Sequence, residues 1–461
     1  MYLPKSKEMK SLENMPEISE ISSKLQQFFE ELDLKTLALN HKFIKKERSL
    51  TAEAFLKMCI ASVAESGLTP TLVDHCEELQ KLGIQMVPES LNAQFKLEAV
   101  NFLKSIFDHL LKSKISSLDK LNVDTKFSSI YIEDSTILNL SASLVKYFKG
   151  FGGGASKSAA KLNYRYDLLG DDANITITAA TKSDSQLCTI QKKSAVKTGA
   201  LYLQDLGYYK LDRFAIIIDN GGYIITRFKT DTNVYLTKDK DAEAIDLQKI
   251  IKKLKQGQIK DFWVYVGAKN RVRMRMIITK LPDKVAAENR RKYKKTCSKR
   301  QKAVKKNRLA FCDCTIYLTN LEEQEYDAEQ IAKLYGVRWQ IEITFKVWKS
   351  IYKMGCVRKM KVERFLCLLY AQLIWITLNR KVFDVIKRFY WNEKGKELSE
   401  LKCFKLIRRF RQLFLDAFFV NSKELYEDFL NNSIRACQKY GWKVGKKQQP
   451  NLLNHIKKKV T

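Results

Sequence analysis

The sequence is organised around Tyr335-Gly-Val-Arg338-Trp-Gln-Ile-Glu342-Ile-Thr-Phe-Lys346-Val-Trp-Lys349. Tyr335, Arg338, Glu342 and Lys349 recur at spacings that place them in one stripe along a helix. A single carboxylate among a phenol, a guanidinium and an ammonium fits a metal-bound phosphate backbone. The plainer alternative is a solvated helix face on which Arg338 and Glu342 form an i,i+4 ion pair. Lys346 offers Glu342 a second i,i+4 partner, which would compete with a metal ion.

The composition indicates a globular protein that binds a polyanion. The chain has 461 residues, of which 45% are hydrophobic and 11% are aromatic. Such a chain forms one large core or about two to four domains. The 83 Lys and Arg residues against 51 Asp and Glu residues leave a net charge of +32, spread along most of the length. Nucleic acid is the leading candidate for the partner, and a membrane surface is the competitor.

The apolar segments do not favour a membrane. Met1-Tyr-Leu-Pro-Lys-Ser-Lys has no long apolar run behind it, so we expect no secretory signal. The most apolar run, Phe365 to Leu378, is short and contains Gln372, which predicts a buried helix. Ten scattered cysteines give no disulfide framework and favour a reducing cytosol. We therefore expect a cytoplasmic protein.

The first region, residues 1–118, is predicted to be helical. Thr69 and Pro70 form a good helix start, with Thr as N-cap and Pro at the first helical position. Another helix begins near Pro88 or Ser90. Helices of this pattern form either a helix-turn-helix-like DNA module or a plain packing domain, and the charge balance favours DNA. The second helix carries apolar residues at spacings of three and four: Leu91, Phe95, Ala99, Phe102, Ile106 and Leu110.

Strand patterns dominate after residue 128, where apolar and polar residues alternate. Asp134 lies near the end of the first expected strand, and Asp205 directly follows the fourth. The order of elements predicts the first half of a ribonuclease-H-like core. The expected elements are strands at 128–138, 161–167, 174–180 and 200–203, a helix over 211–218 and a strand over 223–228.

An insertion then interrupts this core. Two strand-like runs precede a strongly basic stretch, Arg290 to Arg308, which reads as a helix or helical hairpin with few acidic neighbours and favours contact with phosphates. A strand is expected over 309–318. It contains the one close cysteine pair, Cys312-Asp-Cys314, which is too far from any histidine in sequence to predict a zinc site.

The predicted fold class is therefore α/β: a ribonuclease-H-like catalytic core, a mixed sheet with helices, interrupted by a β-rich insertion and flanked by helical terminal regions. Asp327 is the expected N-cap of a long helix from Ala328 to about Tyr352, which carries Glu342. The expected regions are a helical N-terminal DNA-binding region (1–118), the first half of the core (119–230), the β-rich insertion (231–324), the second half of the core with the Glu helix (325–380), and a helical C-terminal region (381–461).

Three carboxylates are expected to meet in this fold. Asp134 and Asp205 lie on neighbouring strands, and Glu342 faces them from the helix that crosses the sheet. Phosphodiester cleavage commonly uses two divalent ions held by oxygen ligands, which carboxylates provide. Each Asp alone is more commonly a turn or cap residue. Among the competing carboxylates, Glu133 points to the opposite strand face and Asp184 and Asp219 read as turn residues.

These motifs resemble those of DDE transposases of the insertion-sequence-four family, relatives of the transposon-five transposase. Tyr335-x2-Arg338-x3-Glu342-x6-Lys349 has the full spacing of the family's YREK signature. Asp134-Ser-Thr and Asp205-Leu-Gly-Tyr resemble its first and second aspartate motifs. The likeness covers roughly residues 50–380 and is most specific around 335–349.

The resemblance implies a role for each of these residues. Asp134, Asp205 and Glu342 would bind two Mg²⁺ ions, for which Mn²⁺ can substitute. Arg338 and Lys349 would hold phosphates of the transposon end, and Tyr335 would contact its backbone. In relatives a tryptophan of the insertion stacks on a flipped base. Trp263 is the only tryptophan in that segment, but its motif context does not carry the role over, and a core position is the favoured alternative.

The resemblance further implies cut-and-paste transposition of a bacterial insertion sequence. Water attacks first, and the freed 3′-hydroxyl then joins the target. The expected partners are double-stranded DNA, as terminal inverted repeats and as target, and a second copy of the chain in a homodimeric synaptic complex, without a membrane. The expected place of action is the bacterial nucleoid. The alternatives are a domesticated or inactive DNA-binding protein of the same fold and a stand-alone nuclease.

Overall fold

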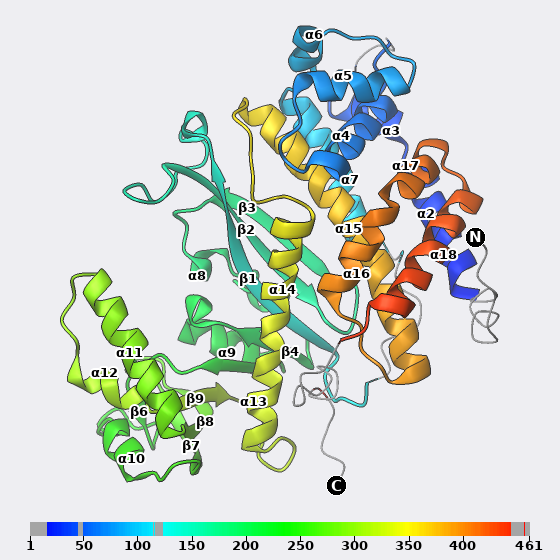
Figure 1. The fold of residues 1–461 in the computed structure, drawn as a ribbon. Coiled ribbons are helices and arrows are strands. Elements are labelled where there is room, and N and C mark those ends of the chain that lie inside the picture. Colours follow the sequence, from blue (N-terminus) through cyan, green and yellow to red (C-terminus); the bar gives the residue numbers. More distant parts are fainter. Residues whose placement is uncertain (1–15, 45–48, 114, 116–122, 444–455, 457–461) are drawn as a thin grey trace.

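The computed structural model describes residues 16–44, 49–113, 115, 123–443 and 456, and its centre is a mixed sheet of nine strands (Figure 1). The strand order is β3-β2-β1-β4-β5-β9-β8-β7-β6. β4 pairs in parallel with β1 and with β5, and the other neighbours are antiparallel. The strands are β1 (Ser129–Leu140), β2 (Ser158–Asp167), β3 (Ala173–Ala179), β4 (Ala200–Gln204), β5 (Tyr223–Arg227), β6 (Val234–Tyr235), β7 (Ile259–Val266), β8 (Val272–Lys280) and β9 (Cys314–Thr319).

The two faces of the sheet belong to two hydrophobic clusters. Ile132 and Leu203 point into the larger cluster, which also contains the helices that follow β9. Tyr131 and Tyr202 point the other way, into a smaller cluster. This division follows from the alternation of side chains along a strand. The smaller cluster also contains buried residues of α9 (Leu211–Asp219) and α10 (Leu247–Lys253).

Helices of both ends of the chain pack together on the larger cluster. Figure 1 shows α13 and α14 crossing the sheet and α15 lying between the sheet and the N-terminal helices. The predicted run from Phe365 to Leu378 is part of α15, and Phe365, Gln372 and Leu378 are buried, so the prediction of a buried helix is confirmed. These helices are α13 (Ala328–Gly336), α14 (Gln340–Lys346), α15 (Val362–Lys394), α16 (Glu400–Ile407), α17 (Arg411–Val420) and α18 (Lys423–Tyr440).

The N-terminal helices differ from the prediction in two details. The N-cap is Thr71 rather than Thr69, because Thr71 and Asp74 form a reciprocal capping box. The second predicted helix is two helices, because Lys96 has an extended backbone conformation that ends the first one. Periodicity continues across this break because both helices bury apolar residues in one core. The helices are α2 (Pro16–Glu31), α3 (Leu34–Asn40), α4 (Ala52–Ser66), α5 (Leu72–Lys81), α6 (Pro88–Gln94) and α7 (Leu97–Lys112).

The insertion continues the central sheet, because β9 pairs with β5 on one side and β8 on the other. The basic stretch forms α11 (Asp283–Lys299) and α12 (Lys306–Phe311), as expected. The expected strand over 309–318 is too long, since α12 takes up its start and β9 begins at Cys314. Cys312 therefore caps a helix while Cys314 opens a strand, and the two thiols do not share a strand face.

The boundary expected at residue 380 falls inside α15, a continuous helix of 33 residues. The division of the chain into functional regions stays a prediction, and so does DNA contact by the N-terminal helices. Within the described ranges, no helix is long and apolar enough to cross a membrane.

Candidate active site

The pairing of β1 with β4 brings Asp134 and Asp205 side by side. Glu133 is opposite Gln204 in the parallel register, so the next position on each strand carries an aspartate. Ile132 and Leu203, two residues before each aspartate, point into the larger hydrophobic cluster. Alternation therefore directs both carboxylates to the face that α13 and α14 cover. Asp134 lies in the middle of β1 rather than near its end.

The helix opposite these aspartates is continuous but changes pitch twice. It begins at α13, where Asp327 and Gln330 form a capping box, which confirms the predicted N-cap. A 3₁₀ turn over Val337–Trp339 precedes α14, and a π-helical turn over Val347–Ile351 follows it. Such π turns are rare in proteins, and those that occur are frequently found at functional sites.

Arg338 lies between two of the three predicted metal ligands. Its Nη2 donates to Glu342 Oε1 at 2.8 Å, and its Nη1 is 3.6 Å from Asp134 Oδ2. Burial alone would lower the pKa of Arg338, but the hydrogen bond with Glu342 and the nearby acidic groups raise it overall. The i,i+4 pair of Arg338 with Glu342 is thus formed, and in the described part of the chain no ion pair joins Lys346 to Glu342.

Tyr335 connects the helix to the second aspartate. Its hydroxyl donates to Asp205 Oδ1 at 3.4 Å, a long hydrogen bond. Burial, with the charge of Asp205 as a second cause, raises the pKa of Tyr335 to about 12, so the phenol stays protonated as a donor. The guanidinium of Arg227, on β5, lies 5.6 Å from the centre of the Tyr335 ring.

The surroundings of Asp134 shift the pKa of its carboxyl group upward. Burial raises its pKa to about 6, and the negative charges of Asp205 and Asp184 add to this rise. The backbone N–H of Ser135, which donates to Asp134 Oδ1 at 2.8 Å, and the charge of Arg338 act in the opposite direction. A carboxylate with this surplus of negative neighbours is stabilised by a cation, and Arg338 supplies one.

The chemical type of the side chains suits a hard divalent cation, since the three carboxylates offer oxygen ligands only. In the arrangement described here, however, no group of three or more His, Cys, Asp or Glu side chains is placed to hold a metal ion within the described ranges. The guanidinium of Arg338 instead contacts both Asp134 and Glu342. Binding of a metal ion by all three carboxylates therefore requires Arg338 to move.

Two predicted residues lie apart from this cluster. Lys349 lies in the π turn, and none of its interactions among the described residues is with the three carboxylates. Trp263, on β7, is only half-buried and lies under the Arg273 guanidinium at 4.2 Å, so the expectation of a core position is wrong. The strand register places its side chain on the same sheet face as Arg275 and Thr319.

A polar cluster on the opposite sheet face supports the aspartates, and it was not predicted from the sequence. Asp184 accepts hydrogen bonds from Ser135 at 2.7 Å and from Lys161 at 3.0 Å. Asp184 Oδ2 also lies only 2.9 Å from where a Cβ on Gly207 would be, in the turn that follows Asp205. Asp184 is the first residue of a short helix, α8 (Asp184–Leu187). Through these contacts it supports both segments that carry the aspartates.

Glu133 is buried on the same opposite face, as predicted. Asn163 Nδ2 and the backbone N–H of Thr189 each donate to Glu133 Oε1 at 2.8 Å. The only signal in the sequence for either acidic residue was its strand or turn position, because their partners come from distant segments.

This geometry, two strand aspartates facing a helix glutamate, is accompanied by a family match. Residues 125–378 match the family described as the transposase DDE domain, more than half of the chain. The protein is therefore an enzyme of the DDE transposase class. Such a domain implies dependence on divalent metal ions in general, and transposases act on DNA.

Comparison with individual proteins narrows the class. The chain is 31% identical to the transposase for insertion sequence element IS1151 of Clostridium perfringens, over 95% of this chain and 96% of that protein. It is 31% identical to the transposase for IS231E of Bacillus thuringiensis subsp. finitimus, over 88% and 90% of the two chains. It is 30% identical to the transposase for IS231B of Bacillus thuringiensis subsp. berliner, over 91% and 94%. The chain belongs to this family of insertion-sequence transposases, and the resemblance noted in the sequence is confirmed.

Proposed function

We propose that this chain carries out cut-and-paste transposition of a bacterial insertion sequence. The observation that carries the proposal is the convergence of Asp134, Asp205 and Glu342 on one side of the sheet, with Arg338 and Tyr335 among them. A DNA-binding module has no need of three carboxylates at one point. The substrates are double-stranded DNA, first the terminal inverted repeats of the element and then a target, and the place of action is the bacterial nucleoid.

The strand order supports a ribonuclease-H-like core. The first five strands lie in the order β3-β2-β1-β4-β5, with β1 antiparallel to β2 and parallel to β4. The candidate ligands then come from the two central strands and from the helix that crosses them. In this assignment β6 to β9, with α10 to α12, form the insertion.

We assign the three carboxylates to two Mg²⁺ ions, with Mn²⁺ able to replace them because the ligands are all oxygens. When bound, the ions polarise the scissile phosphate and activate the attacking oxygen. Asp134 and Asp205 hold their side of the site through the paired strands, and Glu342 closes it from α14. The attacking groups are water and then the freed 3′-hydroxyl.

Arg338 and Tyr335 act on the DNA in this proposal. The guanidinium of Arg338 moves from Glu342 and Asp134 to a DNA phosphate, which offers it bidentate acceptors. The protonated Tyr335 hydroxyl donates to the backbone in place of Asp205. Lys349 contacts a phosphate further along the helix. Binding of DNA thereby frees the carboxylates from Arg338 and Tyr335, so that they can bind metal ions. A homodimer then pairs two transposon ends in one synaptic complex.

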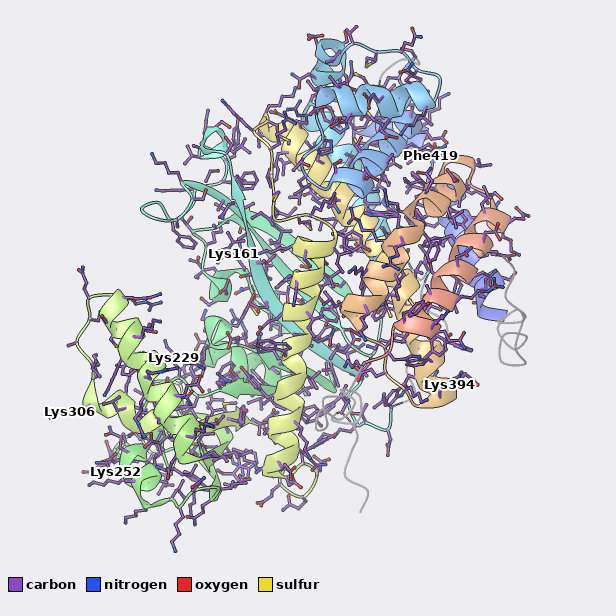
Figure 2. All side chains as sticks on the ribbon, viewed as in Figure 1. Lys161, Lys229, Lys252, Lys306, Lys394 and Phe419 are labelled. Atoms are coloured by element: carbon purple, nitrogen blue, oxygen red, sulfur yellow. The ribbon has the colours of Figure 1, made fainter. Side chains whose placement is uncertain are left out.

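The basic helices of the insertion support DNA binding. In α11 and α12 and the turn between them, Arg290 pairs with Asp313 and Lys292 with Glu288. Figure 1 shows these helices on the outer side of the insertion, and Figure 2 shows Lys306 at the edge of the molecule. Exposed cations for which the described residues provide no ion pair are Arg291, Lys294, Lys295, Lys299, Arg300, Lys302, Lys305, Lys306 and Arg308.

The proposal is tested with duplexes that carry the element's own ends and flanking DNA. Wild-type protein with Mg²⁺ should nick and then excise at the element boundary, and Glu342→Gln should bind the same duplex without cutting it. Glu329→Gln is the matched control, an exposed glutamate of the same helix, paired with Lys333. Binding without any cleavage by the wild type would instead identify a DNA-binding protein, and equal cleavage of unrelated duplexes would identify a nuclease.

A further inference from the structure

A basic groove lies beside the catalytic helix, outside the cluster described above. It has a volume of about 550 Å³ and is formed where the end of α14 meets α16, α17 and the end of α4. One acidic side chain, Glu65, lines it. Five positive charges against one negative charge leave a net charge of +4. The five cations are Lys346, Lys405, Arg408, Arg409 and Arg411.

Packing within the protein explains two of these cations. Arg411 Nε donates to Glu65 Oε2 at 2.6 Å, and Arg408 Nη2 donates to the Glu65 carbonyl oxygen at 3.2 Å. Both contacts tie α4 to the C-terminal helices. Burial lowers the pKa of Arg408, and the positive charge of Arg411 lowers it further, so the two guanidinium groups repel one another. Arg408 Nε is buried and has no hydrogen-bond partner among the described residues.

The other three cations are not explained by packing. Lys346, Lys405 and Arg409 are exposed, and in the described part of the chain no acidic group forms an ion pair with any of them. Like charges held together without a counter-charge destabilise a folded protein, and a polyanion relieves the repulsion. The groove therefore has the electrostatic character of a binding surface rather than of a solvated helix face.

The groove begins one helical turn beyond the candidate active site. Lys346 is one helical turn beyond Glu342, about 6 Å along the axis at 1.5 Å per residue. Ser350, one further turn along, also lines it. A DNA strand with its scissile phosphate at Glu342 would pass the groove within a few nucleotides. The apolar lining residues are the aliphatic Ile351 and Leu401, so among the described residues the groove has no aromatic ring on which a base could stack.

We propose that the basic groove binds the sugar–phosphate backbone of the DNA strand that leaves the active site along α14. This inference rests on the proposed function and assigns a DNA contact to the C-terminal helices. Phosphate contacts of this kind position the DNA without reading its sequence. The strand belongs either to the transposon end or to the target, and the two sources share the chemistry that the groove recognises.

The test compares two double variants that each remove two positive charges. Lys405→Gln with Arg409→Gln removes two of the three groove cations that have no ion pair among the described residues, and leaves Lys346, one turn from Glu342, in place. Lys394→Gln with Lys439→Gln is the control, from exposed positions on α15 and α18. Figure 2 shows Lys394 at the opposite end of the C-terminal helices from Phe419 on α17. Circular dichroism and thermal unfolding should be the same for both variants and the wild type, because none of the four residues is buried.

The readout is the dependence of DNA affinity on salt, measured by fluorescence anisotropy with a short labelled duplex. Each lost phosphate contact lowers the slope of log K against log salt by about 1, so the groove variant should lose about 2 and the control none. An unrelated duplex gives this result whether or not the chain transposes, so it tests the groove separately from the proposed function. Equal slopes for the two variants would overturn the proposal.

Two further arms identify the source of the strand. A duplex that carries the element's end tests the donor strand, and strand transfer of a pre-cut end into a plasmid tests the target strand. A larger loss of affinity for the end duplex than for the unrelated duplex assigns the groove to the donor. A loss of strand transfer, with no larger loss of affinity for the end duplex than for the unrelated duplex, assigns it to the target. Loss in neither arm contradicts the proposal even where wild-type cleavage proceeds normally.

Discussion

Glu400 is predicted to hold the catalytic helix in place from the C-terminal region. It is 5% exposed and lies at the start of α16. Its carboxylate accepts from Gln340 Nε2 at 2.6 Å and from Thr344 Oγ1 at 2.8 Å. Both donors belong to α14, two residues before and two after Glu342. Arg380 Nη1 of α15 lies 3.0 Å from the same carboxylate.

Glu400→Ala should lower the free energy of unfolding by about 3 to 5 kcal/mol, because it leaves Arg380 buried with one partner fewer and the Gln340 amide without its acceptor, while Thr344 keeps only its 3.2 Å bond to the Gln340 carbonyl oxygen. Guanidinium unfolding measures the change. Glu329→Ala is the control, since Glu329 is 74% exposed and its pair with Lys333 is worth at most about 0.5 kcal/mol.

Glu400→Gln keeps the shape of the side chain and an acceptor oxygen but removes the charge. It should be less destabilising than Glu400→Ala, and the loss of DNA cleavage should follow the same order. If the free energy of unfolding of Glu400→Ala lies within about 1 kcal/mol of the wild-type value, the buried pair of Glu400 and Arg380 does not contribute the stability that we expect from its burial. If both variants are destabilised but cleave normally, Glu400 supports the fold without positioning α14.

Three further substitutions test local features. Gly207→Ala places a Cβ 2.9 Å from Asp184 Oδ2, so it should shift the turn after Asp205 and slow cleavage of end duplexes more than it changes the unfolding midpoint; an unchanged cleavage rate would contradict the bracing role of Asp184. Gly336→Ala meets nothing within 4 Å in the helix and should raise stability by about 0.5 to 1 kcal/mol in guanidinium unfolding; a loss of stability would show a contact that the structure lacks. Burial, with Arg364 as a second cause, lowers the pKa of His75 from 6.5 to about 4. As the pH falls, the unfolded chain therefore takes up the proton before the folded protein does. About 3 kcal/mol of stability that is present above pH 6.5 is lost as the pH falls to about 4. The unfolding free energy of His75→Gln should lack this part of the pH dependence, and an equal loss in both proteins would refute the assignment.

The local features of the fold were predictable because they depend on residues close in sequence. Alternating side chains predicted the strands that carry Asp134 and precede Asp205, and the Asp327 cap marked the start of the catalytic helix. The adjacency of the two aspartates followed from strand order alone. Helix ends were less predictable, because the capping box at Thr71 and the extended Lys96 depend on individual backbone conformations.

The contacts between distant segments could not be predicted from the sequence. Periodicity offered Glu342 two equivalent partners, and only the packing of α14 on β1 decides for Arg338, since Asp134 attracts the same guanidinium. Asp184 had the pattern of an ordinary turn residue, although it braces the segments of both aspartates. No pattern in the sequence indicated the role of Glu400, because Gln340 and Thr344 lie some 60 residues earlier in the chain.

The central claim is that Asp134, Asp205 and Glu342 act as one site. The most direct measurement is the single-turnover rate of nicking at the element boundary in Mg²⁺, for Asp134→Asn, Asp205→Asn, Glu342→Gln and the double variant Asp134→Asn with Glu342→Gln. Groups that act as a unit are not additive, so each single variant should fall to the same background rate and the double variant no lower. A single variant that cuts at the wild-type rate, or a double variant whose loss is the product of the two single losses, would contradict the claim.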